Sequence, residues 1–307
     1  MLLSVPNVSD GRSAATIAAI VEAAGQGGGA DGAARLLDVH SDADHHRSVL
    51  TLAARPGRLA DSVLGLARAA VERIDVIGRG EDPASRGQHP HVGAVDVVPV
   101  VYIDPGDRGA ACAEALVVAD RIGAELGVPV FLYGELTTDA QGPGRTRAEL
   151  RRGGVRALAL RMSGTTDEPP LRPDFGPAEL HPTAGATLVA AREPLVAFNL
   201  QLTPPASVED AHAIAAAIRE GGARGMPGLR AIGVALGDGV AQVSMNVERP
   251  LELPLAEVVE GVRAFAPVSS AELVGLAPAA ALDGFPAELP MPGFDPARHV
   301  IENALGC

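Results

Sequence analysis

The stretch Leu195-Val196-Ala197-Phe198-Asn199-Leu200-Gln201-Leu202 sets large apolar side chains at every second position. Residues two apart in an extended chain share a face, so this alternation predicts a half-buried β-strand. Ser207, with Asp210 three residues later, then caps a predicted helix that runs to about Arg219. Strands near 229–236 and 242–248, a helix over 255–265 and a strand over 272–276 follow. The second half of the chain is thus predicted to have the order β-α-β-β-α-β.

The first half shows the same order of signals. Apolar runs predict strands over 2–5, 36–39, 47–53 and 95–103, and helical spacing predicts helices over 13–24 and 59–74. An extra helix over 110–126 and a strand over 128–133 come after them. Pro99 interrupts the 95–103 strand, which predicts a bulge or a place near a sheet edge.

Together the two halves predict an α+β protein of two ferredoxin-like (βαββαβ) subdomains, residues 1–190 and 191–307. We expect mixed, antiparallel-rich sheets with helices packed on one face, and a ligand cleft between the two subdomains. Between residues 135 and 180 the periodicity fades into Gly, Pro, Thr and Arg, with a short helix indicated over 147–152. This segment is either an ordered functional loop or a flexible one.

The composition excludes several classes of function. The 307 residues carry a formal net charge of −13, only 3% of them are aromatic, and none is tryptophan, so the basic surface and stacking rings of nucleic-acid binders are missing. Every basic residue other than histidine is arginine, which excludes lysine Schiff bases and a Walker lysine. Two distant cysteines indicate neither a disulfide framework nor a zinc site. The sequence shows no signal peptide and no membrane span, so we expect a cytoplasmic protein.

Two histidines flank one proline in Gln88-His89-Pro90-His91-Val92-Gly93-Ala94-Val95-Asp96. The proline favours an extended backbone at His89, so both rings can project into one pocket about 6–7 Å apart. Histidine exchanges protons near neutral pH, which suits a catalytic site. From local spacing alone, a structural histidine pair that caps a strand is the equally open interpretation.

A second histidine-rich stretch, His40-Ser41-Asp42-Ala43-Asp44-His45-His46, contains enough ligands for a metal if it is extended. The short polar side chains favour a turn instead, because they bond to nearby backbone. Arginines crowd the 145–172 region and can hold an anionic substrate or balance nearby acids. The glycines at 27, 29 and 32 follow a helix instead of a strand, and the Gly-x-Ser-x-Gly elbow is missing, so dinucleotide binding and serine catalysis are not supported.

Seven segments in order resemble the formiminotransferase domain of the glutamate formimidoyltransferase family. They span essentially the whole chain, and they are residues 5–11, 88–96, 127–135, 173–177, 185–187, 197–200 and 273–276. The resemblance implies two subdomains with a reduced folate held between them, and transfer of a formimino group from N-formimino-L-glutamate to N5 of tetrahydrofolate in histidine degradation. It also implies a homodimer, tetrahydrofolate as co-substrate and no metal. We expect no cyclodeaminase domain.

The same resemblance implies roles for individual residues. His89 falls in the family's Glu-His-Pro-Arg motif and is expected to be the catalytic acid and base. The folate-contacting segment maps to Gly176, Pro177, Ala178, Glu179, Leu180, His181, Pro182, Thr183, Ala184 and Gly185. Arg47 and Arg192 are predicted to bind carboxylates, and His91 and His40 to be polar residues of the pocket.

Four positions depart from the family pattern and keep other functions open. Gln88 and His91 replace the glutamate and arginine around His89, His40 stands where some members carry an acid, and Ala184 replaces an aromatic residue. One alternative is a paralogue that uses another one-carbon donor or amine. A second is a non-catalytic folate-binding module, and a metal hydrolase is the remaining candidate.

Overall fold

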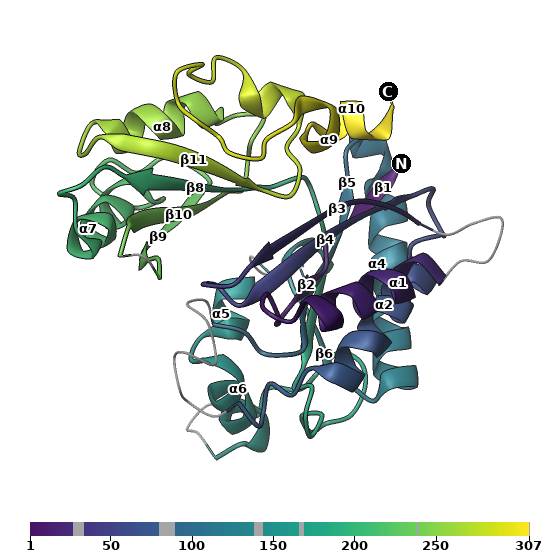
Figure 1. Ribbon diagram of the computed structural model, residues 1–307. Coiled ribbons are helices and arrows are strands. Elements are labelled where there is room, and N and C mark those ends of the chain that lie inside the picture. The colour runs from purple at the N-terminus through teal and green to yellow at the C-terminus, as the bar shows by residue number, and fades with distance from the viewer. Residues whose placement is uncertain (27–33, 80–89, 138–143, 166–168, 238, 307) are drawn as a thin grey trace. The chain divides into compact units, whose positions relative to one another are not determined.

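The structure is a computed structural model that describes residues 1–26, 34–79, 90–137, 144–165, 169–237 and 239–306 (Figure 1). The chain divides into two compact units, Met1–Arg192 and Glu193–Cys307. Both contain helices and sheets, so the predicted α+β class is confirmed. No helix in these described ranges is long and apolar enough to cross a membrane.

The first unit is built on a seven-stranded sheet. Its strands are β1 (Leu2–Ser4), β2 (Asn7–Val8), β3 (Arg35–Asp42), β4 (Arg47–Ala54), β5 (Val95–Tyr102), β6 (Val130–Leu132) and β7 (Thr187–Arg192). β3 pairs with β4. β1 and β2 both lie between β4 and β5. On the other side of β5, β7 comes next and β6 follows it. Pairing is antiparallel from β3 to β5 and parallel between β5, β7 and β6, so this sheet is mixed as predicted.

Pro99 lies inside this sheet, not at its edge. β5 has β1 and β2 on one side and β7 on the other, so the edge position is wrong. The register between β2 and β5 does shift, but between Val97 and Val95, so the predicted bulge does not lie at Pro99. The Pro99 carbonyl accepts the Val5 amide at 3.1 Å in the gap between β1 and β2. A broken neighbouring strand is what allows a proline in an interior strand.

Helices cover both faces of the first sheet. α1 (Ala14–Gln26), α2 (Ala60–Arg73) and α4 (Arg108–Leu126) share one core with the sheet, whereas α5 (Arg147–Arg151) and α6 (Gly154–Ser163) pack on Val97, Phe131 and Leu188, which belong to the other face. Figure 1 shows α5 and α6 set apart from the other three helices. The prediction of helices on one face is therefore wrong for this unit. Parallel strands such as β6 and β7 need cover on both faces.

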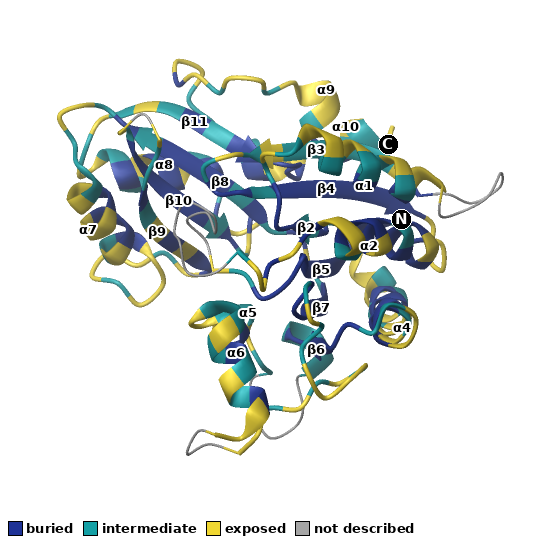
Figure 2. Ribbon diagram, turned by 60° about the horizontal axis from the view of Figure 1, so that its bottom comes forward, coloured by how far each residue is buried: buried dark blue, intermediate teal, exposed yellow. Residues whose placement is uncertain are grey.

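The second unit has a four-stranded sheet in the order β11-β8-β10-β9, made of β8 (Val196–Leu202), β9 (Leu229–Ala235), β10 (Ala241–Val247) and β11 (Val268–Val274). All pairs are antiparallel, so the predicted mixed sheet is wrong here. α7 (Val208–Ile218) and α8 (Leu255–Arg263) pack on Val196, Phe198, Leu200 and Leu202, the predicted apolar face of β8. Figure 2 shows β8 and β10 as largely buried strands.

Short helices complete the described chain. In the first unit they are the 3-10 helices η1 (Pro105–Asp107) and η2 (Gly134–Thr137). In the second unit they are η3 (Ala279–Leu282), α9 (Pro296–His299) and α10 (Ile301–Leu305), all after the last strand.

Candidate functional site

A small polar pocket in the first unit gathers residues from four separate parts of the chain. We call it the histidine pocket, and it is lined by Asn7, Val8, Ser9, His45, His46, Arg47, Pro90, His91, Asp96 and Arg151. Its volume is about 20 Å³, which is room for one water-sized group. Two predicted site residues, His91 and Arg47, are brought together here. His89 and Gln88 lie outside the described residues.

The Pro90–Asp96 segment is tied to the sheet by a carboxylate and by backbone bonds. Asp96, inside β5, accepts the Val92 amide on Oδ1 at 2.7 Å. The Ala94 amide donates to the Ala184 carbonyl at 2.8 Å, and the Ala186 amide donates to the Val92 carbonyl at 2.9 Å. The described part of the 88–96 segment, from Pro90 on, therefore lies beside the 185–187 segment, and the resemblance singled out both.

Two glycines permit this close approach. A Cβ on Gly93 would lie 1.8 Å from the Ala186 carbonyl oxygen, which is far inside van der Waals contact. Gly185 has φ +70°, and a Cβ there would lie 2.3 Å from the Val92 carbonyl oxygen. Any side chain at either position would push the two segments apart.

The predicted folate segment, 176–185, is anchored at both ends. Before its start, the Val130 amide donates to the Phe175 carbonyl at 2.9 Å. Near its end, His181 Nδ1 accepts the Ala184 amide at 3.0 Å, and burial lowers the pKa of His181. The residues from Gly176 to Glu179 are exposed. Ala184 is buried in the hydrophobic core, so its methyl group contributes to packing.

Asp96 also forms a buried ion pair. Its Oδ2 accepts from Arg151 Nη2, and the Asp96 and Arg151 side chains are 6% and 15% exposed. Arg151 ends α5, whose start is fixed by a capping box in which Thr146 and Glu149 bond to each other's backbone amides. One carboxylate thus holds both the Pro90–His91 segment and the α5 helix at the histidine pocket.

His46 is the most constrained histidine of the pocket. Its φ is +49°, in the left-handed region, and its side chain is 10% exposed. The Gly11 amide donates to Nδ1 at 3.2 Å, so the neutral ring carries its proton on Nε2. Burial and the neighbouring Arg79 and Arg12 lower the pKa of His46 to about 4, although Asp10 lies 3.7 Å from Nδ1. The ring is therefore neutral near pH 7.

The β3–β4 connection is the turn that the short polar side chains favour. Asp42 Oδ1 accepts the amides of Asp44 and His45, both at 2.9 Å. His45 is buried and its Nε2 lies 3.6 Å from Asp42 Oδ2. Among the described residues, no group of three or more His, Cys, Asp or Glu side chains is placed to hold a metal ion.

The other predicted site residues lie further away. His40 pairs with Val49, which pairs with Asn7, so His40 shares the face of Asn7 without lining the pocket. Arg192 pairs with Val101 near the end of β5, five residues or about 16 Å along the strand from Asp96. The structure does not bring Arg192 to the histidine pocket.

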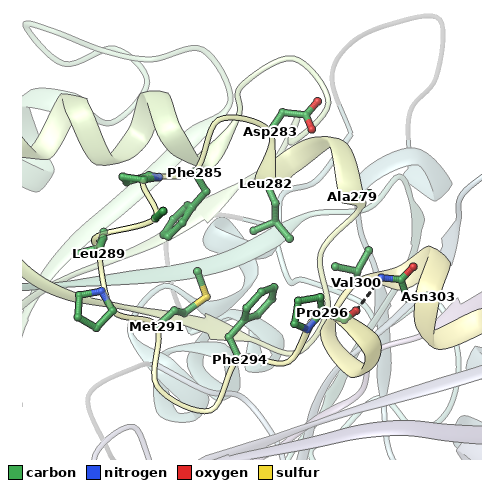
Figure 3. Close-up of a pocket in the computed structure, with 13 residues that line it drawn as sticks. Ala279, Leu282, Asp283, Phe285, Leu289, Met291, Phe294, Pro296, Val300 and Asn303 are labelled. Carbon is green, nitrogen blue, oxygen red and sulfur yellow. Dashed lines mark hydrogen bonds between the residues drawn. The ribbon is translucent and has the colours of Figure 1, made fainter.

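A larger cavity of about 610 Å³ lies in the second unit (Figure 3). We call it the C-terminal pocket, and it is lined by Ala279, Leu282, Asp283, Phe285, Pro286, Ala287, Leu289, Pro290, Met291, Phe294, Pro296, Val300 and Asn303. Figure 3 shows Leu282, Phe285, Met291 and Phe294 turned toward one another, whereas the Asp283 carboxylate points away. The Asn303 amide is bonded to the Pro296 carbonyl at 2.9 Å. This lining offers no histidine and no cation for a carboxylate.

The sequence indicated His46 as a possible metal ligand and Arg151 as one of the arginines that can hold an anion, but it did not place either of them beside His91, and it gave no role to Asp96. Asp96 was inside the quoted motif, and its place six residues after Pro90 was the available signal. His46 and Arg151 meet the motif only through tertiary contacts. Their positions in the sequence do not indicate this contact.

Comparison with known proteins identifies the family. The sequence model of the formiminotransferase domain, N-terminal subdomain, matches residues 1–192. The chain is 36% identical to the glutamate formimidoyltransferase of Streptococcus pyogenes serotype M1, over 98% of this chain and 97% of that protein. This chain belongs to the formiminotransferase family. It is also 33% identical to the glutamate formimidoyltransferase of Thermoplasma acidophilum, over 98% of this chain and 96% of that protein.

Members of the family also occur in longer proteins. The chain is 36% identical to the formimidoyltransferase-cyclodeaminase of Sus scrofa, over 91% of this chain but 50% of that protein. It therefore spans about half the length of these two-activity relatives, which also include the protein of Gallus gallus. The resemblance inferred from the seven segments is confirmed.

Proposed function

We propose that this protein is a folate-dependent formimidoyltransferase, which moves the formimino group of N-formimino-L-glutamate to N5 of tetrahydrofolate and releases glutamate. The observation that carries this proposal is the contact between the Pro90–Asp96 segment and the 181–186 segment, beside a pocket lined by histidines and arginines. The relatives that match over nearly their full length are named glutamate formimidoyltransferase, which agrees with this proposal.

The reaction needs one proton to move. N5 of the folate attacks the formimino carbon, and a tetrahedral intermediate with a new N–C bond forms. N5 loses a proton, the C–N bond to glutamate breaks, and the leaving glutamate nitrogen gains a proton. We assign this transfer to His89, whose imidazole can accept the first proton and return it to the second nitrogen.

The described residues support binding and orientation. Arg47 is proposed to bind a carboxylate, and its fork geometry suits that group. The 176–185 segment is proposed to contact the folate, with His91 beside it and His40 on the same face of the sheet. Arg192 is left out of this proposed site, because it lies near the far end of β5.

The wider setting is part of the same proposal. Residues 1–190 would form the N-terminal subdomain and 191–307 the C-terminal one. The enzyme would act in the cytoplasm as a homodimer, in histidine degradation. Light scattering of the purified protein tests the dimer, since a monomer at micromolar concentration would contradict it.

The test is a direct assay of the purified chain. With N-formimino-L-glutamate and tetrahydrofolate it should form 5-formiminotetrahydrofolate and glutamate in equal amounts. N-formyl-L-glutamate, offered in a parallel reaction, is the matched donor for a paralogue because it differs only at the transferred carbon. Turnover of the formyl donor alone would replace the proposal by that paralogue, and folate binding without turnover of either donor would favour a binding module.

A further inference from the structure

His46 is held in an unusual way for a residue of a surface turn. Its φ of +49° is rare for residues other than glycine, and histidine is among the few that tolerate it. The Gly11 amide fixes the ring through Nδ1 at 3.2 Å. Gly11 itself is required there, since a Cβ would lie 2.1 Å from the Asp42 carbonyl oxygen. Gly11 thus fixes the orientation of the His46 ring, and its close approach to Asp42 fixes the backbone of the turn.

The second ring nitrogen, Nε2, is the one that can bond to a ligand in the histidine pocket. Because Nδ1 accepts a bond, Nε2 carries the proton, and the described residues give it no acceptor. His46 lines the histidine pocket with nine-tenths of its side chain buried. A donor without a protein acceptor at the pocket is available to an acceptor on a bound molecule.

The charges around His46 favour an anion. Arg47 and Arg151 line the same pocket, and Arg12 and Arg79 lie close enough to oppose protonation of the ring. Against these four cations stand three acids: Asp10, which faces His46 from the β2–α1 connection, Asp96, which is paired with Arg151, and Asp75, which faces Arg79. The other imidazoles that line the pocket are His45 and His91. The balance is positive in a chain whose net charge is −13.

The size of the pocket narrows the choice of group. A volume of about 20 Å³ takes one water-sized polar group and not a ring system. A carboxylate oxygen is such a group, and it accepts both from an imidazole N–H and from a guanidinium.

We propose that His46 donates its Nε2–H to a carboxylate of the bound substrate, next to Arg47, and so helps to set specificity. The inference rests on the proposed function, because that reaction has two sources of carboxylate. One is the glutamate part of the formimino donor and the other is the glutamate part of the folate. Separate titrations with each compound distinguish them.

The experiment uses two variants that separate the hydrogen bond at Nδ1 of His46 from the hydrogen bond at its Nε2. His46→Asn keeps an acceptor near the Nδ1 position and tolerates the left-handed backbone, but it has no donor at the Nε2 position. His46→Gln places an amide N–H near the Nε2 position. Titration calorimetry on the full chain measures the Kd of N-formimino-L-glutamate and, separately, of tetrahydrofolate.

For one of the two compounds we expect His46→Asn to raise Kd by about 10-fold or more, and His46→Gln to stay within about threefold of wild type. Unchanged Kd values in His46→Asn overturn the inference. So do equal losses in both variants, because packing and not the donor would then explain them. If a variant does not fold, the Nε2 proton resonance of wild-type His46 decides, since a bound carboxylate must shift it and the absence of a shift overturns the inference.

These outcomes are separable from those of the proposed function. A wild-type enzyme that transfers the formimino group while His46→Asn binds both compounds normally refutes only the role of His46. A wild-type protein that binds a carboxylate through His46 without transfer refutes only the reaction. A wild-type protein that binds neither compound overturns the inference directly.

Discussion

The histidine pocket and the C-terminal pocket differ in almost every respect. The first is about 20 Å³ and polar, and its lining comes from β2, the β3–β4 turn, the segment before β5 and α5. The second is about 610 Å³ and mostly apolar, and its lining comes from one continuous stretch, 279–303. The smaller one contains the groups that can bind a carboxylate and move a proton.

The candidate site is the pocket where distant segments of the chain meet, and not the pocket with the larger volume. Segments far apart in sequence meet at the histidine pocket only because Gly93 and Gly185 let backbones touch and Asp96 ties the segment before β5 to α5. The C-terminal pocket forms where a proline-rich stretch closes over a sheet. We expect the C-terminal pocket to contribute to packing.

The largest effect is expected where two backbones touch. Gly93→Ala puts a Cβ 1.8 Å from the Ala186 carbonyl oxygen, so the segments must separate. We expect the free energy of unfolding to fall by about 3 kcal/mol or more, and turnover to be lost. Urea denaturation and the transfer assay measure both. Gly109→Ala is the matched control, because a Cβ there meets nothing within 4 Å, and equal behaviour of the two variants would contradict the account.

The Asp96–Arg151 pair should give the next largest effect. Asp96→Asn leaves the Arg151 charge buried without its partner, and about 3 kcal/mol of stability should be lost. Adding Arg151→Met removes the stranded charge. The double variant should therefore be more stable than Asp96→Asn alone, as thermal denaturation can show. A double variant that is less stable would mean that the ion pair does not organise the pocket.

A substitution in the C-terminal pocket should affect stability but not substrate binding. Leu289 is 5% exposed, so Leu289→Ala leaves a cavity and should lower the free energy of unfolding by about 2 kcal/mol. KM for both substrates should stay at the wild-type value at temperatures where the variant is folded. A large change in KM would show that this pocket also binds substrate.

The last effect is spread over a range of pH. The pKa of His46 lies at about 4 instead of 6.5, so between these values the unfolded chain takes up a proton that the folded ring refuses. The stability due to the neutral ring is full above pH 6.5 and is lost as the pH falls toward 4. His46→Asn removes this term. Its unfolding free energy should fall less steeply in that window, by up to about 1.4 kcal/mol per pH unit.

Local patterns were enough for much of the fold. The strand predicted over 195–202 is β8, and the helix capped by Ser207 is α7, with Asp210 in the capping box as predicted. These elements are amphipathic, so their periodicity carries the information. α6 was missed because glycines border it and its two buried side chains, Leu158 and Met162, give a weak pattern.

Pairing between distant segments could not be predicted. β7 joins the first sheet between β5 and β6 in parallel, and nothing local in Thr187–Arg192 indicates its partners. For the same reason the sequence identified the Pro90–Asp96 motif but not its contact with His46. The prediction for Arg192 rests on its residue type and on its place at the start of the second half of the chain. The register of β7 places it away from the pocket.

The most direct test of the central claim is the kcat of His89→Ala in the transfer of the formimino group from N-formimino-L-glutamate to tetrahydrofolate. Leu289→Ala is assayed beside it at a temperature where both variants are folded. We expect kcat of His89→Ala to fall by about 100-fold or more and kcat of Leu289→Ala to match wild type. A His89→Ala protein that turns over at the wild-type rate would contradict it.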